Sequence, residues 1–306
     1  MSIKNSINFI IAGAAKCGTT SLFEALGKHP DIFIPDNKEP WHFSHRNIDL
    51  SKIVLGPQKK KIIKTTDDYF KLFDNARVGQ ICGEASTVYL YDYRETIKNL
   101  SDIVHDWREI KIVIVLRNPV SRAFSHYMNN VRAGYDKGSF RDAVNLCIRN
   151  KATRYRNYVE YGLYSKQVEY YLDNFNHVKV IIFEEMIKDS NKIIKEVFEF
   201  LGCQIYENEI YQLEKKNASG RSRLPLITSL IYRPNPIKSV ASLAIPRKIR
   251  RWTVNMIENS ALKKEAMRND DKQYLQGYYH DDIIALEKLM GYTIEAWSNI
   301  DSQDCR

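Results

Sequence analysis

Two short stretches of the chain combine small, hydroxyl-bearing and cationic residues in patterns that are suited to binding an anion. The first is AGAAKCGTTS, in which Gly13 and Gly18 enclose four residues and are followed by Thr19, Thr20 and Ser21. A glycine-rich turn between a strand and a helix binds anions because backbone N–H groups converge there and the helix dipole favours negative charge. The pattern predicts an anion-binding loop, with tight strand–helix packing as the alternative.

The lysine of this loop has an unusual position. A nucleoside-triphosphate loop has the pattern G-x-x-x-x-G-K-[ST], with lysine directly after the second glycine. In this chain Thr19 occupies that place, and the only lysine, Lys16, lies between the two glycines. The expected strand ends also lack an obvious aspartate for Mg²⁺, which a triphosphatase needs. A P-loop kinase or ATPase is therefore the less favoured function, and Lys16 is expected to contact a different anion.

The second stretch, IVIVLRNPVSRAFSHY, again joins an apolar run to an expected helix. Arg117 stands at the end of the run, where a guanidinium can bind a phosphate with two parallel hydrogen bonds. Pro119 suits the first turn of a helix, and Ser121 and Ser125 are four residues apart, on one helix face. An ordinary junction with solvated charges is the alternative, but the presence of two such junctions in one chain argues against it.

Strands and helices alternate along the chain in the order that would place both stretches at the edge of one sheet. Apolar runs predict strands at 7–12, 31–35, 79–86, 111–119 and 178–186, and amphipathic patterns predict helices at 20–28, 119–132, 139–149, 163–174 and 190–201. This alternation indicates an α/β fold with a mostly parallel sheet covered by helices on both faces. We expect a single domain over residues 1–306, in which the basic and apolar segment 225–260 is either a lid facing the substrate or a packed connector.

The composition limits the partners. The chain has 306 residues, a net charge of +9 and 44% hydrophobic residues, and its pI of about 9.1 favours anionic ligands in general, nucleic acid included. No apolar run approaches a membrane span of roughly 20 residues, and the N-terminus lacks a signal-peptide pattern. Five scattered cysteines indicate reduced thiols, without a disulfide or metal framework. From these features we expect a cytoplasmic protein.

The motifs together resemble those of the sulfotransferases that use 3′-phosphoadenosine 5′-phosphosulfate (PAPS), especially the branch with glycosaminoglycan enzymes and bacterial relatives. AGAAKCGTTSL is similar to the family's 5′-phosphosulfate loop, and VLRNPVSRAFSHY is similar to its 3′-phosphate motif. KEPWHFS, NASGRSRL and the ending YYHDDIIALEKLMGYTIEAW resemble further family segments in the same order. The resemblance implies a three-layer fold similar to that of P-loop NTPases.

The resemblance also implies roles for individual residues. Lys16 would contact the bridging oxygen of the donor, and Glu39 would take the proton of the acceptor, with His42 as the alternative base. The donor would further be bound by residues of both motifs and of a late loop: Cys17, Gly18, Thr19, Thr20, Ser21, Arg117, Ser125, Gly220 and Arg221. Ala85 stands where some relatives have a lysine, and Cys17 is expected to fill space. Tyr158, Tyr161 and Tyr164 either line the acceptor or adenine pocket or pack in the core.

The expected reaction is transfer of a sulfuryl group from PAPS to a hydroxyl or amine, leaving adenosine 3′,5′-bisphosphate, with no metal. The family branch favours a carbohydrate acceptor, and a small natural product or a lipid headgroup is the alternative. A non-catalytic nucleic-acid-binding protein would also suit the pI, but it is the less favoured function. Nothing in the sequence predicts an oligomeric state.

Overall fold

The computed structural model describes residues 7–49, 62–206, 209–213, 221–222, 262–263 and 265–298. Its central sheet contains the strands β1 (Phe9–Gly13), β2 (Ile32–Phe33), β3 (Ile81–Ala85), β4 (Lys111–Leu116) and β5 (Val178–Ile182). The strands are all parallel and lie side by side in the order β2-β3-β1-β4-β5. Because both faces of a parallel sheet are covered, its strands are continuous apolar runs, and β1 is buried over its whole length.

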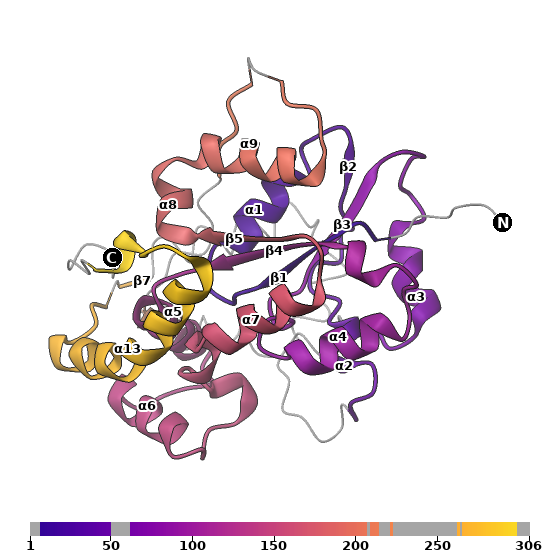
Figure 1. Cartoon of the computed structure of the whole chain (residues 1–306). Coiled ribbons are helices and arrows are strands. Elements are labelled where there is room, and N and C mark those ends of the chain that lie inside the picture. Colours follow the sequence, from indigo (N-terminus) through magenta and orange to yellow (C-terminus); the bar gives the residue numbers. More distant parts are fainter. Residues whose placement is uncertain are drawn as a thin grey trace.

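Helices cover both faces of this sheet (Figure 1), which confirms the expected three-layer α/β fold. On one face lie α1 (Thr19–Leu26), α8 (Phe183–Lys188) and α9 (Ser190–Leu201). On the other lie α4 (Tyr93–Ser101), α5 (Pro119–Arg132) and α7 (Ser165–Asn174). The remaining helices pack around this frame: α2 (His42–His45), α3 (Thr66–Phe70), α6 (Phe140–Ile148), α13 (Asn269–Met290) and α14 (Glu295–Ser298).

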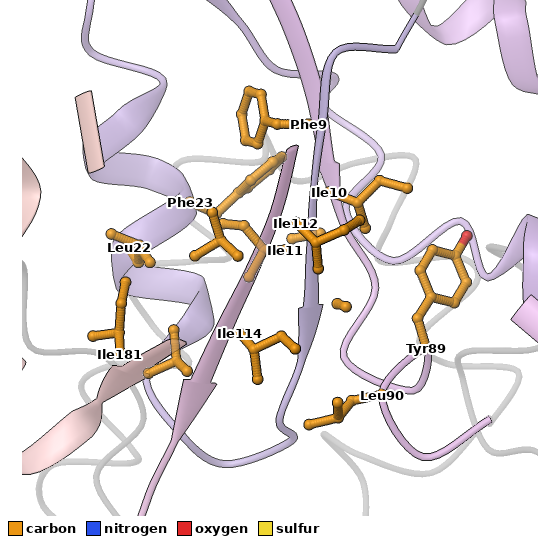
Figure 2. Packing of buried hydrophobic residues seen from close by; sticks show 14 of the residues in the cluster. Phe9, Ile10, Ile11, Leu22, Phe23, Tyr89, Leu90, Ile112, Ile114 and Ile181 are labelled. Carbon is orange, nitrogen blue, oxygen red and sulfur yellow. The ribbon is translucent and has the colours of Figure 1, made fainter. Parts of the chain in front are cut away.

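The main hydrophobic core lies between the sheet and its helices. Figure 2 shows Phe9, Ile10 and Ile11 of β1 beside Ile112 and Ile114 of β4, with Leu22 and Phe23 of α1 at the left of the view. These strand residues are at most 1% exposed, so they hold the carboxyl ends of β1 and β4 in a fixed relation. Both anion-binding stretches begin at those two ends.

Two of the predicted elements differ from the structure. The expected strand 178–186 ends at Ile182, and the next residues form α8, because the acidic pair Glu184 and Glu185 suits the first turn of a helix. Helix α7 begins at Ser165, so the preceding tyrosines are not part of it. Tyr158, Tyr161 and Tyr164 are at most 5% exposed, which favours their packing role.

Other expectations meet the limits of the described residues. Gly220 and the segment 225–260 lie outside them, and the single-domain organisation stays a prediction. Two short strands, β6 (Arg221–Ser222) and β7 (Leu262–Lys263), pair antiparallel. Among the residues that the structure describes, none of the helices has the length and apolar character to cross a membrane.

Candidate active site

The candidate site lies at the carboxyl-terminal edge of the parallel sheet, where β3, β1 and β4 end side by side. In open α/β sheets, ligands bind at this edge, near the point where the strand order changes direction. The chain that leaves β1 is tied to its neighbours there, because the Ala14 N–H donates to the Val115 carbonyl at 2.7 Å and the Leu90 N–H donates to the Ala12 carbonyl at 2.8 Å.

The first junction connects β1 to α1 and carries the predicted loop. Gly18 precedes α1 in the left-handed region, with φ of 78°, and no side chain caps the helix. A Cβ at Gly18 would lie 2.7 Å from the Phe183 ring, so both the backbone angle and the space require glycine. Cys17 is buried, and burial raises the pKa of its thiol to about 11, which supports its space-filling role.

The second junction connects β4 to α5. Asn118 caps α5, since its Oδ1 accepts hydrogen bonds from the N–H groups of Val120 and Ser121, each at 3.1 Å. Pro119 occupies the first helical turn, as predicted. The guanidinium of Arg117 lies over the Phe183 ring, 4.9 Å from its centroid. Ser121 and Ser125 are buried on α5, so the helix carries both serines directly after Arg117.

The two junctions meet. Arg117 Nη1 donates a hydrogen bond to the backbone carbonyl of Lys16 at 3.5 Å. The cations that the sequence assigned to opposite ends of one donor therefore lie at the same edge of the sheet, close enough for a single ligand to contact both.

The environment of Lys16 adds a cation that was not predicted. Burial, followed by the positive charges of Arg132 and Arg117, lowers the pKa of Lys16 to about 8, while Glu39 and Cys17 act in the opposite direction. Arg132 is the last residue of α5 and is 9% exposed. Its charge acts on Lys16 from the C-terminal end of α5, and no local motif in the sequence signals it. An excess of positive charge of this kind is suited to a polyanionic ligand.

Glu39 lies beside the first junction on the segment that follows β2. Its N–H donates to the Ala85 carbonyl at the end of β3, and its Oε1 accepts from the Thr87 hydroxyl, both at 3.0 Å. Lys38 Nζ is 3.9 Å from Glu39 Oε1 and donates to Thr20 Oγ1 at 2.6 Å. Lys38 therefore connects the acid to the anion loop. It was not predicted as a site residue, although its place next to Glu39 in KEPW could have indicated it.

The alternative base, His42, is in the core. It is fully buried, its Nδ1 is 2.9 Å from the Ile63 carbonyl, and its ring stacks on Tyr69. Burial lowers the pKa of His42. Glu39 is half-buried, and its negative charge acts on Lys16 by raising the pKa of that lysine. The geometry therefore favours Glu39 over His42 as the base.

A second acidic side chain in this area was not predicted. Glu84, on β3, is fully buried and accepts hydrogen bonds from Ser86 at 2.7 Å and from Tyr69 at 3.3 Å. Burial raises the pKa of Glu84 to about 7. Ser86 Oγ in turn accepts from the Trp41 N–H at 3.3 Å, so Glu84 supports the turn that carries Glu39.

Left-handed backbone is concentrated here. Within the described parts of the chain, four non-glycine residues have positive φ, and three of them are Lys16, Glu39 and Trp41, with φ of 74°, 62° and 51°. Each such residue costs of order 1–3 kcal/mol and persists only where its surroundings hold it in place.

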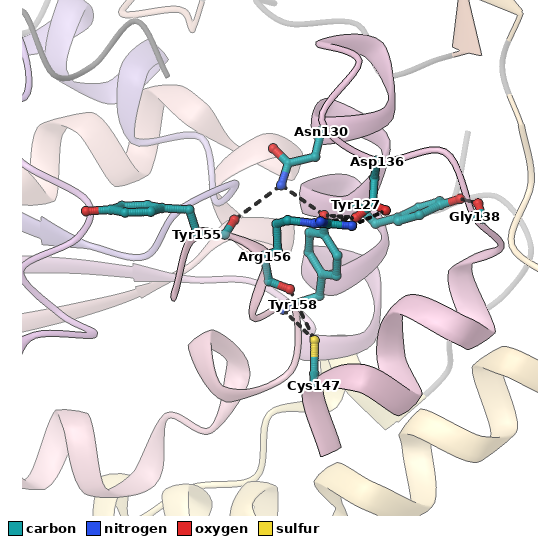
Figure 3. Close-up of polar contacts among 8 residues, drawn as sticks. All are labelled: Tyr127, Asn130, Asp136, Gly138, Cys147, Tyr155, Arg156 and Tyr158. Carbon is teal, nitrogen blue, oxygen red and sulfur yellow. Dashed lines mark hydrogen bonds and ion pairs between the residues drawn. The ribbon is translucent and has the colours of Figure 1, made fainter. Parts of the chain in front are cut away.

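Polar contacts hold the segment that follows α6. Figure 3 shows Asp136 accepting hydrogen bonds from Arg156 and Tyr158, and Asn130 of α5 contacting the same segment. Tyr155, in this segment, stacks on Trp41 with the two rings 4° from parallel. The segment thus connects α5 to the turn that holds Glu39.

Comparisons with known proteins identify the family and agree with the fold. The family model "Sulfotransferase domain" matches residues 6–221. The chain belongs to the sulfotransferase family. A solved sulfotransferase from Alicyclobacillus acidocaldarius is 30% identical, with a TM-score of 0.72, over 96% of this chain and all of that one.

Curated sulfotransferases are more distant. Carbohydrate sulfotransferase 15 of Mus musculus is 23% identical over 73% of this chain and 48% of its own length. Heparan sulfate glucosamine 3-O-sulfotransferase 3B1 of Homo sapiens is 28% identical over 70% of this chain and 53% of its own length. The sulfotransferase described here thus spans about half the length of these relatives.

The remaining predicted donor residues of this sulfotransferase are placed only in part. Thr19, Thr20 and Ser21 form the first turn of α1. Arg221 lies in β6, and the backbone of β6 comes near α5. The assignments of Ser125, Gly220 and Arg221 to the donor stay predictions, and so do those of Lys16, Arg117 and the residues of the first loop.

Proposed function

We propose that this sulfotransferase moves the sulfuryl group of PAPS to a hydroxyl or amine acceptor. The contact between Arg117 and the Lys16 carbonyl carries the proposal, since it brings two anion-binding junctions together. A donor with a 5′-phosphosulfate and a 3′-phosphate presents two separate anionic groups, and the cations at this edge, Lys16, Lys38, Arg117 and Arg132, fit such a ligand.

The proposed reaction is an in-line displacement at sulfur. A bond forms between the acceptor oxygen or nitrogen and sulfur, and the bond between sulfur and the bridging oxygen of the donor breaks. Glu39 takes the acceptor's proton, held in place by Thr87 and by the Ala85 carbonyl. Lys16 stabilises the charge that develops on the leaving oxygen, and the product is adenosine 3′,5′-bisphosphate. The catalytic effect comes from positioning and from preorganised charge.

For the acceptor we propose a carbohydrate, because the curated relatives include carbohydrate and heparan sulfate sulfotransferases. A small natural product or a lipid headgroup is the alternative class. The acceptor experiment uses ³⁵S-labelled PAPS with three sets of acceptors, namely desulfated glycosaminoglycans, simple phenols and amines, and glycolipid headgroups. Transfer of label to the glycosaminoglycans alone supports a carbohydrate acceptor. Transfer to either of the other two sets contradicts it and assigns the acceptor to that class instead.

The donor is tested by binding. We expect adenosine 3′,5′-bisphosphate to raise the melting temperature without added metal, since a ligand that binds only the native state stabilises it. ATP with Mg²⁺ and an oligonucleotide serve as the comparison ligands. Stabilisation by either of these, without stabilisation by the bisphosphate, would contradict the proposed donor.

A further inference from the structure

The residues that open α8 connect several parts of the donor site. Phe183 and Glu184 follow β5, which lies next to β4 in the sheet. Neither was expected to belong to the site, because the sequence predicted a strand through this position.

Glu184 joins two segments that are far apart in the sequence. Its Oε1 accepts a hydrogen bond from the Asn118 N–H at 3.0 Å, and its Oε2 accepts one from Trp297 Nε1 at 3.0 Å. The Trp297 side chain comes from α14, near the end of the described residues, and its ring lies 6.0 Å from that of Tyr164.

The peptide unit between Arg117 and Asn118 is therefore held at both of its polar groups. Its N–H donates to Glu184, and its carbonyl accepts from the Tyr164 hydroxyl at 2.9 Å. Fixing both groups fixes the plane of this peptide, and with it the direction in which the Arg117 side chain leaves the backbone.

Phe183 acts on the guanidinium itself. Arg117 lies over its ring, and the same ring packs against Gly18 in the first junction. The ring thus lies against both junctions and limits the orientations that the Arg117 side chain can adopt.

We propose that Glu184, together with Phe183, Tyr164 and Trp297, forms a positioning bracket that aims Arg117 at the 3′-phosphate of the donor. This inference rests on the proposed function. It makes the C-terminal tryptophan part of donor recognition without requiring it to touch the ligand. A bidentate contact needs both position and direction, so a small rotation of the 117–118 peptide weakens it.

The test measures the affinities of adenosine 3′,5′-bisphosphate and of 5′-AMP by isothermal titration calorimetry. The two ligands differ in the 3′-phosphate, so the ratio of their dissociation constants isolates the group that Arg117 is proposed to bind. Wild type and Arg117→Ala define the two limits of this ratio.

In Glu184→Gln the neutral amide has one accepting oxygen for two donors, so we expect bisphosphate affinity to fall about tenfold, as for a lost charge-assisted hydrogen bond, while 5′-AMP affinity is unchanged. Trp297→Phe keeps the ring and removes the N–H, and we expect about a threefold fall of the same kind. Glu185→Gln, at the exposed next residue, is the matched control and should match wild type.

A double-mutant cycle separates positioning from general structural support. In the Arg117→Ala background, Glu184→Gln should change bisphosphate affinity no further, because coupled residues are not additive. An equal loss of affinity for both ligands in Glu184→Gln and Trp297→Phe, or no loss for either, overturns the bracket. If wild type itself binds the two ligands equally, the proposed donor fails instead, and the bracket with it. Where Glu184→Gln does not fold, Trp297→Phe decides the result alone.

Discussion

At the end of β1 the chain presents a helix without a side-chain cap, whereas at the end of β4 the helix is capped by its own asparagine. The N-terminus of α1 follows Gly18 directly, and Gly18 has no side chain that could cap it, as in anion sites built from backbone amides. The first amides of α5 instead donate to Asn118 Oδ1. An anion at the second junction must therefore be bound by side chains, above all by Arg117.

This difference explains what surrounds each junction. A backbone loop holds its shape through local conformation, so the first junction depends on glycine and on left-handed residues. A long arginine side chain needs support from outside its own segment, and the second junction receives it from Phe183, Glu184 and Tyr164. We expect the first junction to serve the chemical step and the second to serve ground-state binding.

The largest expected effect tests this division of labour. Lys16→Ala should lower kcat by about 10³, because removing one preorganised charge at a developing anion typically costs 10²–10³. Arg117→Ala should instead raise the KM for PAPS by about 10- to 100-fold with little change in kcat, as expected for loss of uniform binding. Steady-state kinetics with ³⁵S-labelled PAPS measures both.

The exposed lysine of α9 provides the control, since Lys192→Ala removes the same charge from a side chain that belongs to neither junction. Circular dichroism confirms that each variant is folded. A wild-type kcat in Lys16→Ala would show that Lys16 does not act in the chemical step. A lower kcat with an unchanged KM in Arg117→Ala would assign the chemical step to the second junction instead.

The next prediction concerns the base beside the first junction. Glu39→Gln should lower kcat by about 10², within the range for a general base, because an amide cannot take the acceptor's proton. His42→Gln should leave kcat within about threefold and lower the melting temperature, since His42 is buried against Tyr69. Greater loss of kcat in His42→Gln than in Glu39→Gln would assign the base to His42.

Gly18→Ala has a smaller effect that is confined to the first junction. A left-handed alanine costs roughly 1–2 kcal/mol, and its Cβ would also press on the Phe183 ring. We expect the free energy of unfolding to fall by about 2 kcal/mol and bisphosphate affinity to fall with it. Gly79→Ala is the matched control, because Gly79 has φ of 88° and an added Cβ would meet no atom within 4 Å. Loss of stability without loss of affinity would show that the loop does not contact the ligand.

The two junctions also differ in how far sequence alone could predict them. Lys16, Gly18 and Arg117 are local signals, and the alternating strands place them at one sheet edge, so the fold and both junctions were predicted. The left-handed φ of Lys16 and Glu39 was not, because no pattern of residue types encodes it. Arg132, Glu184 and Trp297 were missed as site residues because their roles arise from tertiary packing between distant segments, and Glu184 and Trp297, for example, are 113 residues apart.

The smallest predicted effect is a pH dependence that belongs to the first junction alone. Burial and the neighbouring arginines lower the pKa of Lys16 in the free protein from its ordinary value of 10.5 to about 8. A bound polyanion favours the charged ammonium and raises this pKa, so binding takes up a proton above pH 8. The affinity for adenosine 3′,5′-bisphosphate should therefore fall as pH rises from 8 to 10, by at most about tenfold per unit. Phosphate groups are already ionised there, since their second pKa is about 6.

The free protein should show the opposite trend in stability over the same interval. Between pH 8 and 10.5 the unfolded chain keeps the Lys16 proton and the folded chain releases it, so the contribution of this group to the free energy of unfolding rises with pH. Calorimetric titrations at several pH values, with Lys16→Ala beside wild type, separate the two junctions. The pH dependence of bisphosphate affinity should vanish in Lys16→Ala. It should persist in Arg117→Ala, because the guanidinium stays charged over this whole pH range and its removal takes away no titrating group. A slope that survives in Lys16→Ala would place the titrating group elsewhere and would remove the main electrostatic distinction between the two ends of the site.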